Sequence, residues 1–167
     1  QFEETRRSHL VVALSLASSD YGTDAEFEMA VSVAGSLGAR AIRDARTVSV
    51  VASEYTPQFA KRKVFAVRLL STLTRARLLD DLAVVEKSET ALSITDVAKV
   101  AGDQATGVSV AFLVCGSTVN PQELRAASVA FPVGVEVIAI VCDPDRTPGL
   151  RRVSGLNLPM LLRVLNY

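Results

Sequence analysis

Several residue types that mark particular functions are scarce in this sequence. The 167 residues include two cysteines and one histidine, His9. Because a structural or catalytic zinc site draws on several Cys or His ligands, we expect no such site. No apolar run approaches the ~18 residues of a membrane-spanning helix. The segment Gln1–Ser8 is polar and charged, so it does not resemble a signal peptide.

The two cysteines, Cys115 and Cys142, each end a run rich in Val, Ile and Leu. We interpret them as buried, reduced thiols at strand ends, because nothing else in the sequence indicates an oxidising compartment. A disulfide stays open as an alternative, since adjacent strands can bring Cα atoms within the required distance of about 7 Å. His9 stands beside Ser8 where a strand is expected to begin, and we assign it a structural role.

The balance of positive and negative charges argues against a general nucleic acid-binding protein. The 18 Lys and Arg residues match 18 Asp and Glu residues, and the sequence pI is about 6.8. A general binder of nucleic acid usually has a pI above ~9, so we expect no nucleic acid partner. With 49% hydrophobic and 22% charged residues, the chain has the composition of a folded protein. At ~150 residues per domain, residues 1–167 form one domain.

Familiar nucleotide-binding and catalytic motifs are also missing. The sequence has no G-x-x-x-x-G-K-[ST] loop, no G-x-G-x-x-G after its first strand pattern and no G-x-S-x-G elbow. A nucleophile such as Ser19 would have only carboxylates as a base, because His9 is the lone histidine and precedes the first strand. We therefore predict that the domain is not an enzyme and carries no cofactor.

What the sequence does contain is a regular alternation of strand and helix patterns. Nearly continuous apolar runs, typical of strands buried on both faces of a sheet, cover residues 9–17, 47–52, 108–115 and 135–142. Weaker strand patterns cover 64–70 and 152–158. Helical patterns cover 23–45, 75–86, 93–101 and 120–131, and Pro159 opens a final helical pattern to residue 164. This alternation predicts an α/β fold with a doubly wound, mostly parallel, Rossmann-like sheet of five to six strands flanked by helices.

Three of these helices begin with side chains suited to capping. Thr23 and Glu26 form a T-x-x-E capping box, and Ser93 and Asp96 form an S-x-x-D box. Asn120 is an expected N-cap residue, followed by Pro121 at the first helical position and an acidic residue at the third.

Polar residues gather where the predicted strands end, which is where open α/β sheets bind ligands. We call this set the strand-end rim: Ser15, Ser19, Asp20, Thr95, Gly116, Ser117, Thr118 and Asp143. Helix caps in any such fold are rich in Ser, Thr, Asp and Asn, so polarity alone does not distinguish a binding site from ordinary loops.

A basic stretch provides a rival surface. No acidic residue lies between Glu54 and Asp80, and this interval contains Lys61, Arg62, Lys63, Arg68, Arg75 and Arg77. The stretch is either a docking surface for an acidic partner or a solvated strand edge whose charges prevent edge-to-edge aggregation.

The first strand–helix unit, residues 10–43, resembles the start of a von Willebrand factor A-like domain, with a buried strand, a Ser-rich loop and an acidic-aromatic helix start. More specifically, the chain resembles the bacterial family known as domain of unknown function fifty-eight. The most distinctive match is EFEMAVSVAGSL at residues 26–37, and the segments LLDDL at 78–82, LVCG at 113–116 and residues 149–156 also fit.

This resemblance implies a place and a partner. Similar proteins are membrane-anchored through N-terminal hydrophobic segments and carry a cytoplasmic C-terminal domain, and their genes often lie beside those of MoxR-type AAA ATPases. The resemblance thus implies a non-catalytic, adaptor- or chaperone-like domain that binds such an ATPase and does not itself touch the membrane. Because the chain begins with Gln1 rather than Met, we expect it to be the C-terminal part of a longer protein.

The resemblance also implies where a metal site would lie and which of its ligands this sequence lacks. A metal-binding A-domain has Asp-x-Ser-x-Ser after the first strand, a later Thr, and an Asp after the strand at 108–115. The matching positions here are Ser15, Ala17, Ser19, Thr95 and Gly116. Both carboxylates are missing, and hard divalent cations require carboxylate oxygens. We predict a degenerate site without a metal, in which Asp20 is the one carboxylate close by.

Three functions remain open from the sequence. The first is a protein-interaction domain that binds its partner at the strand-end rim. The second is a small-ligand or nucleotide-binding domain, which requires a deep pocket between Ser19 and Ser117. The third is a hydrolase or a transferase, which lacks a recognisable base.

Overall fold

The computed structural model describes residues 8–53, 67–104, 106–146, 149–152 and 159–162. The helices are a 3-10 turn at Ser18–Asp20, α1 (Asp24–Arg43), α2 (Arg75–Ala83), α3 (Ile94–Asp103) and α4 (Pro121–Ser128). The strands are β1 (His9–Leu14), β2 (Val48–Ser53), β3 (Val67–Leu70), β4 (Val108–Gly116), β5 (Glu136–Cys142), β6 (Gly149–Arg152) and β7 (Pro159–Leu162). None of the helices in these ranges is long and apolar enough to cross a membrane.

The strands form one mixed sheet in the order β3-β2-β1-β4-β5-β7-β6. Strands β1, β2, β4, β5 and β7 are parallel, whereas β3 pairs antiparallel with β2 and β6 pairs antiparallel with β7. The doubly wound α/β class is confirmed, and the described ranges contain seven strands instead of the expected five or six. The four strong strand patterns correspond to β2, β1, β4 and β5, which all have a neighbouring strand on each side. Interior strands of such a sheet are covered by helices on both faces, and their sequences are therefore apolar at nearly every position.

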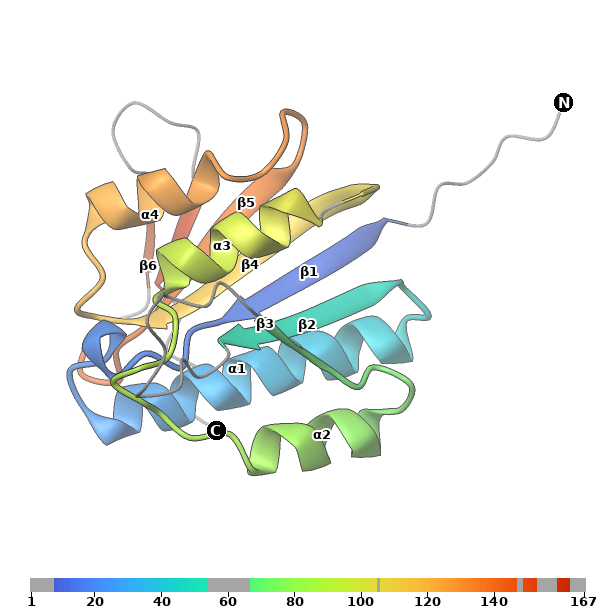
Figure 1. Ribbon diagram of the computed structural model, residues 1–167, viewed down its shortest axis with the longest axis horizontal. Coiled ribbons are helices and arrows are strands. Elements are labelled where there is room, and N and C mark those ends of the chain that lie inside the picture. The colour runs from blue at the N-terminus through green and yellow to red at the C-terminus, as the bar shows by residue number, and fades with distance from the viewer. Residues whose placement is uncertain (1–7, 54–66, 105, 147–148, 153–158, 163–167) are drawn as a thin grey trace, which may run out of the picture.

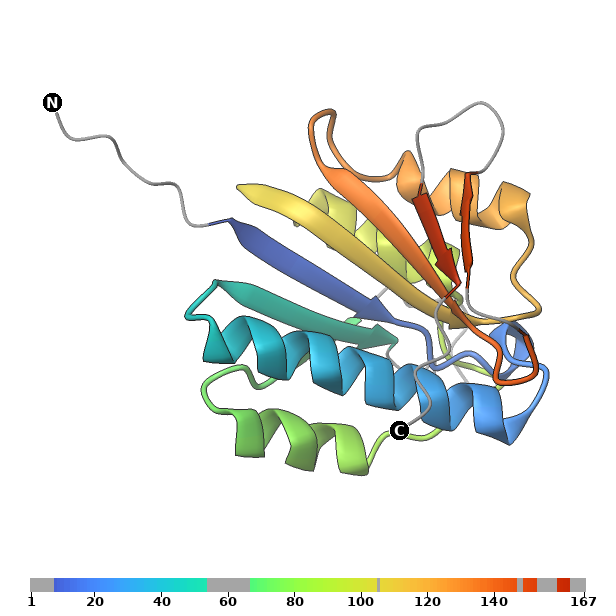
Figure 2. The same cartoon turned by 180° about the vertical axis from the view of Figure 1, so that it is seen from behind.

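Helices cover both faces of this sheet (Figures 1 and 2). Helices α3 and α4 pack on one face against Val11, Ala13 and the other buried side chains that point the same way. On the opposite face α1 packs against Val12 and Leu14 of β1, and α2 packs against α1 and β3. Successive residues of a strand point to opposite faces, so a continuous apolar run in β1 fills two cores at once.

The two cysteines belong to different faces. In the register of β4 and β5, Cys115 pairs with Val141 and Gly116 pairs with Cys142. This offset of one residue puts Cys115 among the side chains under α3 and α4, and Cys142 among those under α1. Both thiols are free and buried, so the expected reduced thiols are confirmed and the disulfide alternative is wrong.

The C-terminal part of the fold differs most from expectation. Residues Pro159–Leu162 form strand β7, paired with Ala139 and Ile140 of β5, and the expected helix at 159–164 is therefore wrong. Proline is tolerated at the first position of either a helix or a strand, so Pro159 did not discriminate between them. A strand was expected at 152–158. The neighbouring strand β6 instead covers Gly149–Arg152, and residues 153–158 lie outside the described ranges.

Candidate functional site

The strand-end rim lies at the point where the sheet reverses its winding. From β1 the chain proceeds to β2 on one side, and from β4 it proceeds to β5 on the other. In open α/β sheets, the crevice beyond the strand ends at such a switch point is the usual binding place. The ends of the two strands are held together here, because the N–H of Ser15 donates to the carbonyl of Val114 at 3.1 Å.

The rim residues differ in accessibility. Ser15, Asp20 and Gly116 are buried, Thr95 and Asp143 are half-buried, and Ser19, Ser117 and Thr118 are exposed. Only the last three, with part of Thr95 and Asp143, can meet a partner directly.

Asp20 has a structural role in this arrangement. Its side chain is only 6% exposed, and Oδ2 accepts hydrogen bonds from the Ser15 hydroxyl at 2.5 Å and from the N–H of Ile94 at 2.8 Å. The carboxylate therefore caps the first N–H of α3 from a different loop. Ser93 is the N-cap residue, as predicted, but the expected box is wrong: the Ser93 side chain makes no capping hydrogen bond, and Asp20 accepts from the helix start instead. Burial raises the pKa of Asp20, and the hydrogen bonds from Ser15 and Ile94 oppose that shift.

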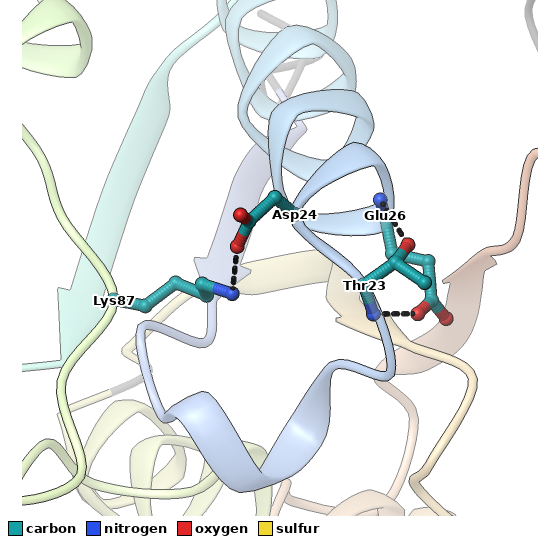
Figure 3. Close-up of polar contacts among 4 residues, drawn as sticks. All are labelled: Thr23, Asp24, Glu26 and Lys87. Atoms are coloured by element: carbon teal, nitrogen blue, oxygen red, sulfur yellow. Dashed lines mark hydrogen bonds and ion pairs between the residues drawn. The ribbon is translucent and has the colours of Figure 1, made fainter.

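Glu26 performs a similar task at the start of α1 (Figure 3). The predicted capping box with Thr23 is present: Glu26 Oε2 accepts from the Thr23 N–H at 2.6 Å, and the Thr23 hydroxyl accepts from the Glu26 N–H at 3.2 Å. The other carboxylate oxygen, Oε1, accepts from the N–H of Ser117 at 2.7 Å. Glu26 thereby ties the beginning of α1 to the loop after β4. Figure 3 also shows Lys87 reaching Asp24, an ion pair on the outer side of the same helix start.

Helix α4, the third helix that begins at the rim, is also capped by a carboxylate of the chain. Glu123 Oε2 accepts from the N–H of Asn120 at 2.8 Å, and the Asn120 side chain accepts from the N–H of Glu123 at 2.9 Å, which forms a capping box at the predicted N-cap of α4. Each of α1, α3 and α4 thus starts against a carboxylate of the chain itself. A helix N-terminus attracts anions, and in these three helices that position is already taken.

Hydroxyl groups join the remaining loops. The Thr118 hydroxyl donates to the carbonyl of Ser19 at 2.5 Å, which connects the loops after β4 and β1. The Thr95 hydroxyl lies 3.5 Å from the carbonyl of Glu123, between α3 and α4. Asp143 stays within its own loop: Oδ1 accepts from the N–H of Asp145, and Oδ2 lies 3.2 Å from Arg146 Nε.

Two residues of this site were not among those predicted from the sequence. Tyr21 is buried, donates its hydroxyl to the carbonyl of Ser15 at 2.7 Å, and meets Phe27 edge-on with ring centroids 5.3 Å apart. Glu26 was recognised only as a capping residue, because its contact with Ser117 joins positions 91 residues apart. A capping box reports on neighbouring residues, so it carried no signal for that distant contact.

The rival basic surface is only partly described. Lys61, Arg62 and Lys63 lie outside the described ranges. Arg68 is exposed on β3, and Arg75 and Arg77 are exposed at the start of α2. Arg68 pairs with Ala52 at the carboxyl end of β2, whereas Arg75 and Arg77 belong to the first turn of α2.

The rim does not fit a divalent cation. The Ser15 hydroxyl is committed to Asp20, whose Oδ2 also accepts from Ile94. A Cβ atom at Gly116 would lie 2.4 Å from the carbonyl oxygen of Asp20, so a carboxylate side chain has no room at that position. Within the described ranges, no group of three or more His, Cys, Asp or Glu side chains is placed to hold a metal ion.

The two buried carboxylates should respond to pH in opposite ways. The pKa of Asp20 is raised above 3.8, so its contribution to stability is complete below that value and is lost as the pH rises through the raised pKa. Burial also acts to raise the pKa of Glu26, but hydrogen bonds from Ser117, Thr23 and Gly22 hold it below 4.5. Its contribution is therefore present above that value and is lost as the pH falls.

We expect Asp20→Asn to gain stability relative to the wild type as the pH rises from acid to neutral. Glu26→Gln should be less stable than the wild type at neutral pH, and the difference should shrink on acidification. Urea denaturation at a series of pH values measures both trends. Parallel pH profiles for the two variants would contradict the assignment of opposite pKa shifts.

Comparisons with known proteins return structural matches alone. No protein-family model matches the chain, and no curated protein matches it. A von Willebrand factor type A protein from Catenulispora acidiphila is 14% identical, with a TM-score of 0.47, over 81% of this chain and 33% of its own. This chain therefore spans about a third of that protein.

Two proteins from Bacteroides are similar over more of their length. An aerotolerance-related membrane protein from Bacteroides fragilis, with multiple mutations to serine, is 14% identical with a TM-score of 0.47 over 93% of this chain and 81% of its own. The conserved hypothetical protein BatB from Bacteroides thetaiotaomicron is 14% identical with a TM-score of 0.45 over 93% and 80%. The likeness concerns chain arrangement and says nothing about the rim residues.

Proposed function

We propose that this domain is a non-catalytic protein-interaction module that binds its partner at the strand-end rim. The observation that supports this most is the capping of α1, α3 and α4 by the chain's own carboxylates, Glu26, Asp20 and Glu123. These contacts hold the rim loops in one arrangement, in which Ser19, Ser117 and Thr118 are exposed. A preorganised surface of this kind loses little conformational entropy when a partner binds.

The same observation disfavours the nucleotide-binding alternative. A phosphate group is usually bound by free N–H groups at a helix start. Here a phosphate at α1, α3 or α4 would approach the carboxylate of Glu26, Asp20 or Glu123 and be repelled. The small-ligand hypothesis therefore has less support than protein binding.

The identity of the partner follows from the resemblance to the family known as domain of unknown function fifty-eight. We infer that the partner is a MoxR-type AAA ATPase, and that the domain is the cytoplasmic C-terminal part of a membrane-anchored protein. Membership in that family, on which both inferences depend, is itself part of this proposal.

An arginine substitution at the rim tests the proposed surface. We expect Ser19→Arg to weaken binding of the ATPase at least ~10-fold, since it adds a bulky charged side chain to an exposed contact position. Ser109→Arg is the matched control, because Ser109 is exposed near the opposite end of β4. Isothermal titration calorimetry measures the affinities, and thermal melts confirm that each variant is folded.

The structure changes which rim residues suit this test. Asp20 is unsuitable, because its carboxylate caps α3 and its loss would alter the fold as well as the surface. If Ser19→Arg binds as tightly as Ser109→Arg, while charge reversal of Arg62 and Lys63 abolishes binding, the basic stretch is the docking surface instead. In that case the affinity should also fall steeply with salt.

If the strand-end rim binds no metal ion, divalent cations should not change the melting temperature of the domain. A ligand present at 100 times its dissociation constant stabilises a fold by ~2.7 kcal/mol, which is visible as a higher melting temperature. We expect equal melting temperatures in EDTA and in millimolar magnesium or manganese, because the residues around Ser15 and Gly116 offer no ligand set. An upward shift with either metal that Asp20→Asn abolishes would show that Asp20 binds a cation after all.

A further inference from the structure

A groove lies between α1 and α2 on the surface, with a volume of about 320 Å³. The two helices run side by side in opposite directions (Figure 2), as the contacts also show: Leu78 lies against Gly38, and Leu82 lies against Gly35. None of the strand-end rim residues lines this groove.

The middle of the groove is lined by small and polar residues of α1 and by leucines of α2. A Cβ atom at Gly35 would lie 3.3 Å from the side-chain ends of Leu79 and Leu82, so the two helices approach closely there. Leu79 nevertheless remains 40% exposed. Ser32 and Ser36 line the groove from α1. Their side chains are small, so another helix can approach this part of the surface closely.

The two ends of the groove carry opposite charges. Glu28 lies near the start of α1 and Arg75 is the first residue of α2, and both line the groove. Because the helices are antiparallel, Arg75 lies beside the Ala39 end of α1, about 16 Å along the helix from Glu28 at ~1.5 Å per residue. Both side chains are exposed, and in the described part of the chain neither forms an ion pair.

We propose that this groove binds a second copy of the same chain, forming a twofold-symmetric dimer. In such an interface one patch faces itself, so a residue at one end meets a residue at the other end of the partner. A twofold axis midway between Glu28 and Arg75 places each beside its opposite charge on the second copy. Leu79 lies near the same midpoint, so its exposed part packs against the second copy and is removed from water.

Charge reversal tests this pairing of the two ends. We expect the wild type to associate as its concentration rises across roughly 1 μM to 1 mM, the range of weak to moderate affinities. Glu28→Arg and Arg75→Glu should each weaken dimerisation at least ~10-fold, because each places like charges together at both ends. The double variant should recover wild-type association, since the pairs are restored in reverse.

Arg77→Glu is the matched control, because Arg77 is exposed on the same turn of α2 but does not line the groove. It should leave dimerisation unchanged. Sedimentation equilibrium measures the association constants. A monomer at every concentration overturns the proposal, as does a dimer that the single reversals leave intact or that the double reversal fails to restore. If the groove instead binds a helix of a different protein, the chain should remain a monomer at every concentration.

Discussion

Replacing Val12 by Asp should leave the domain unfolded. Val12 is 1% exposed in β1, between β2 and β4, and faces the core under α1. An unpaired charge at such a site costs several kcal/mol, which is comparable to the whole stability of a typical domain, about 5–15 kcal/mol. We expect the far-ultraviolet circular dichroism of Val12→Asp to show no cooperative thermal transition.

Two further valines calibrate that result. Val133 is fully exposed in the loop before β5, so Val133→Asp should change the free energy of unfolding by no more than ~0.5 kcal/mol. Val110 in β4 is half-buried, so the same substitution there should have an intermediate effect. A folded, cooperative Val12→Asp protein would contradict the placement of β1 at the centre of the sheet.

Gly102→Ala should be the most damaging of the glycine substitutions within helices. A Cβ atom at Gly102 of α3 would lie 2.1 Å from the carbonyl oxygen of Ala130, and this backbone atom cannot move without displacing the segment after α4. Alanine normally stabilises a helix by ~1 kcal/mol relative to glycine. The measured change in the free energy of unfolding will therefore be the cost of the steric clash minus this gain. We expect a net loss of roughly 2–3 kcal/mol in urea denaturation.

Gly35→Ala in α1 is the matched comparison. Its Cβ atom would meet only the flexible ends of Leu79 and Leu82, at 3.3 Å. In dilute solution this variant should be between neutral and slightly more stable than the wild type, because the gain in helix propensity offsets a small adjustment of the leucines. Equal losses in the two variants would show that the close approach at Ala130 is not what requires Gly102.

The central sheet was predictable because burial on both faces leaves a strong mark on the sequence. The runs that became β1, β2, β4 and β5 are apolar at nearly every position, a pattern that few surface strands share. The shorter strands left weaker marks. In β3, Arg68 and Leu69 are exposed, so the sequence indicated a strand without fixing its direction. In β7, four residues beginning with proline fit a helix start equally well.

The candidate site was predictable as a place but not as a set of contacts. Strand ends and capping sequences located the rim. The box at Thr23 and the N-cap at Asn120 are confirmed, whereas the box expected at Ser93 is wrong, because the Ser93 side chain makes no capping hydrogen bond. The role of Asp20 depends on a hydrogen bond to Ile94, 74 residues away, and the role of Glu26 depends on Ser117. Local patterns report on a helix and its neighbours, so they cannot show which distant loop a carboxylate will reach.

The placement of the two cysteines on opposite faces gives the fold a reporter for each of its layers. Burial raises the pKa of both thiols, that of Cys142 to about 12, so neither reacts with an alkylating reagent while its core stays closed. Cys115 becomes reactive when the α3–α4 layer opens, and Cys142 when α1 lifts from the sheet. Equal labelling rates therefore signify that both layers open in one cooperative event, and unequal rates signify that one layer detaches while the other holds.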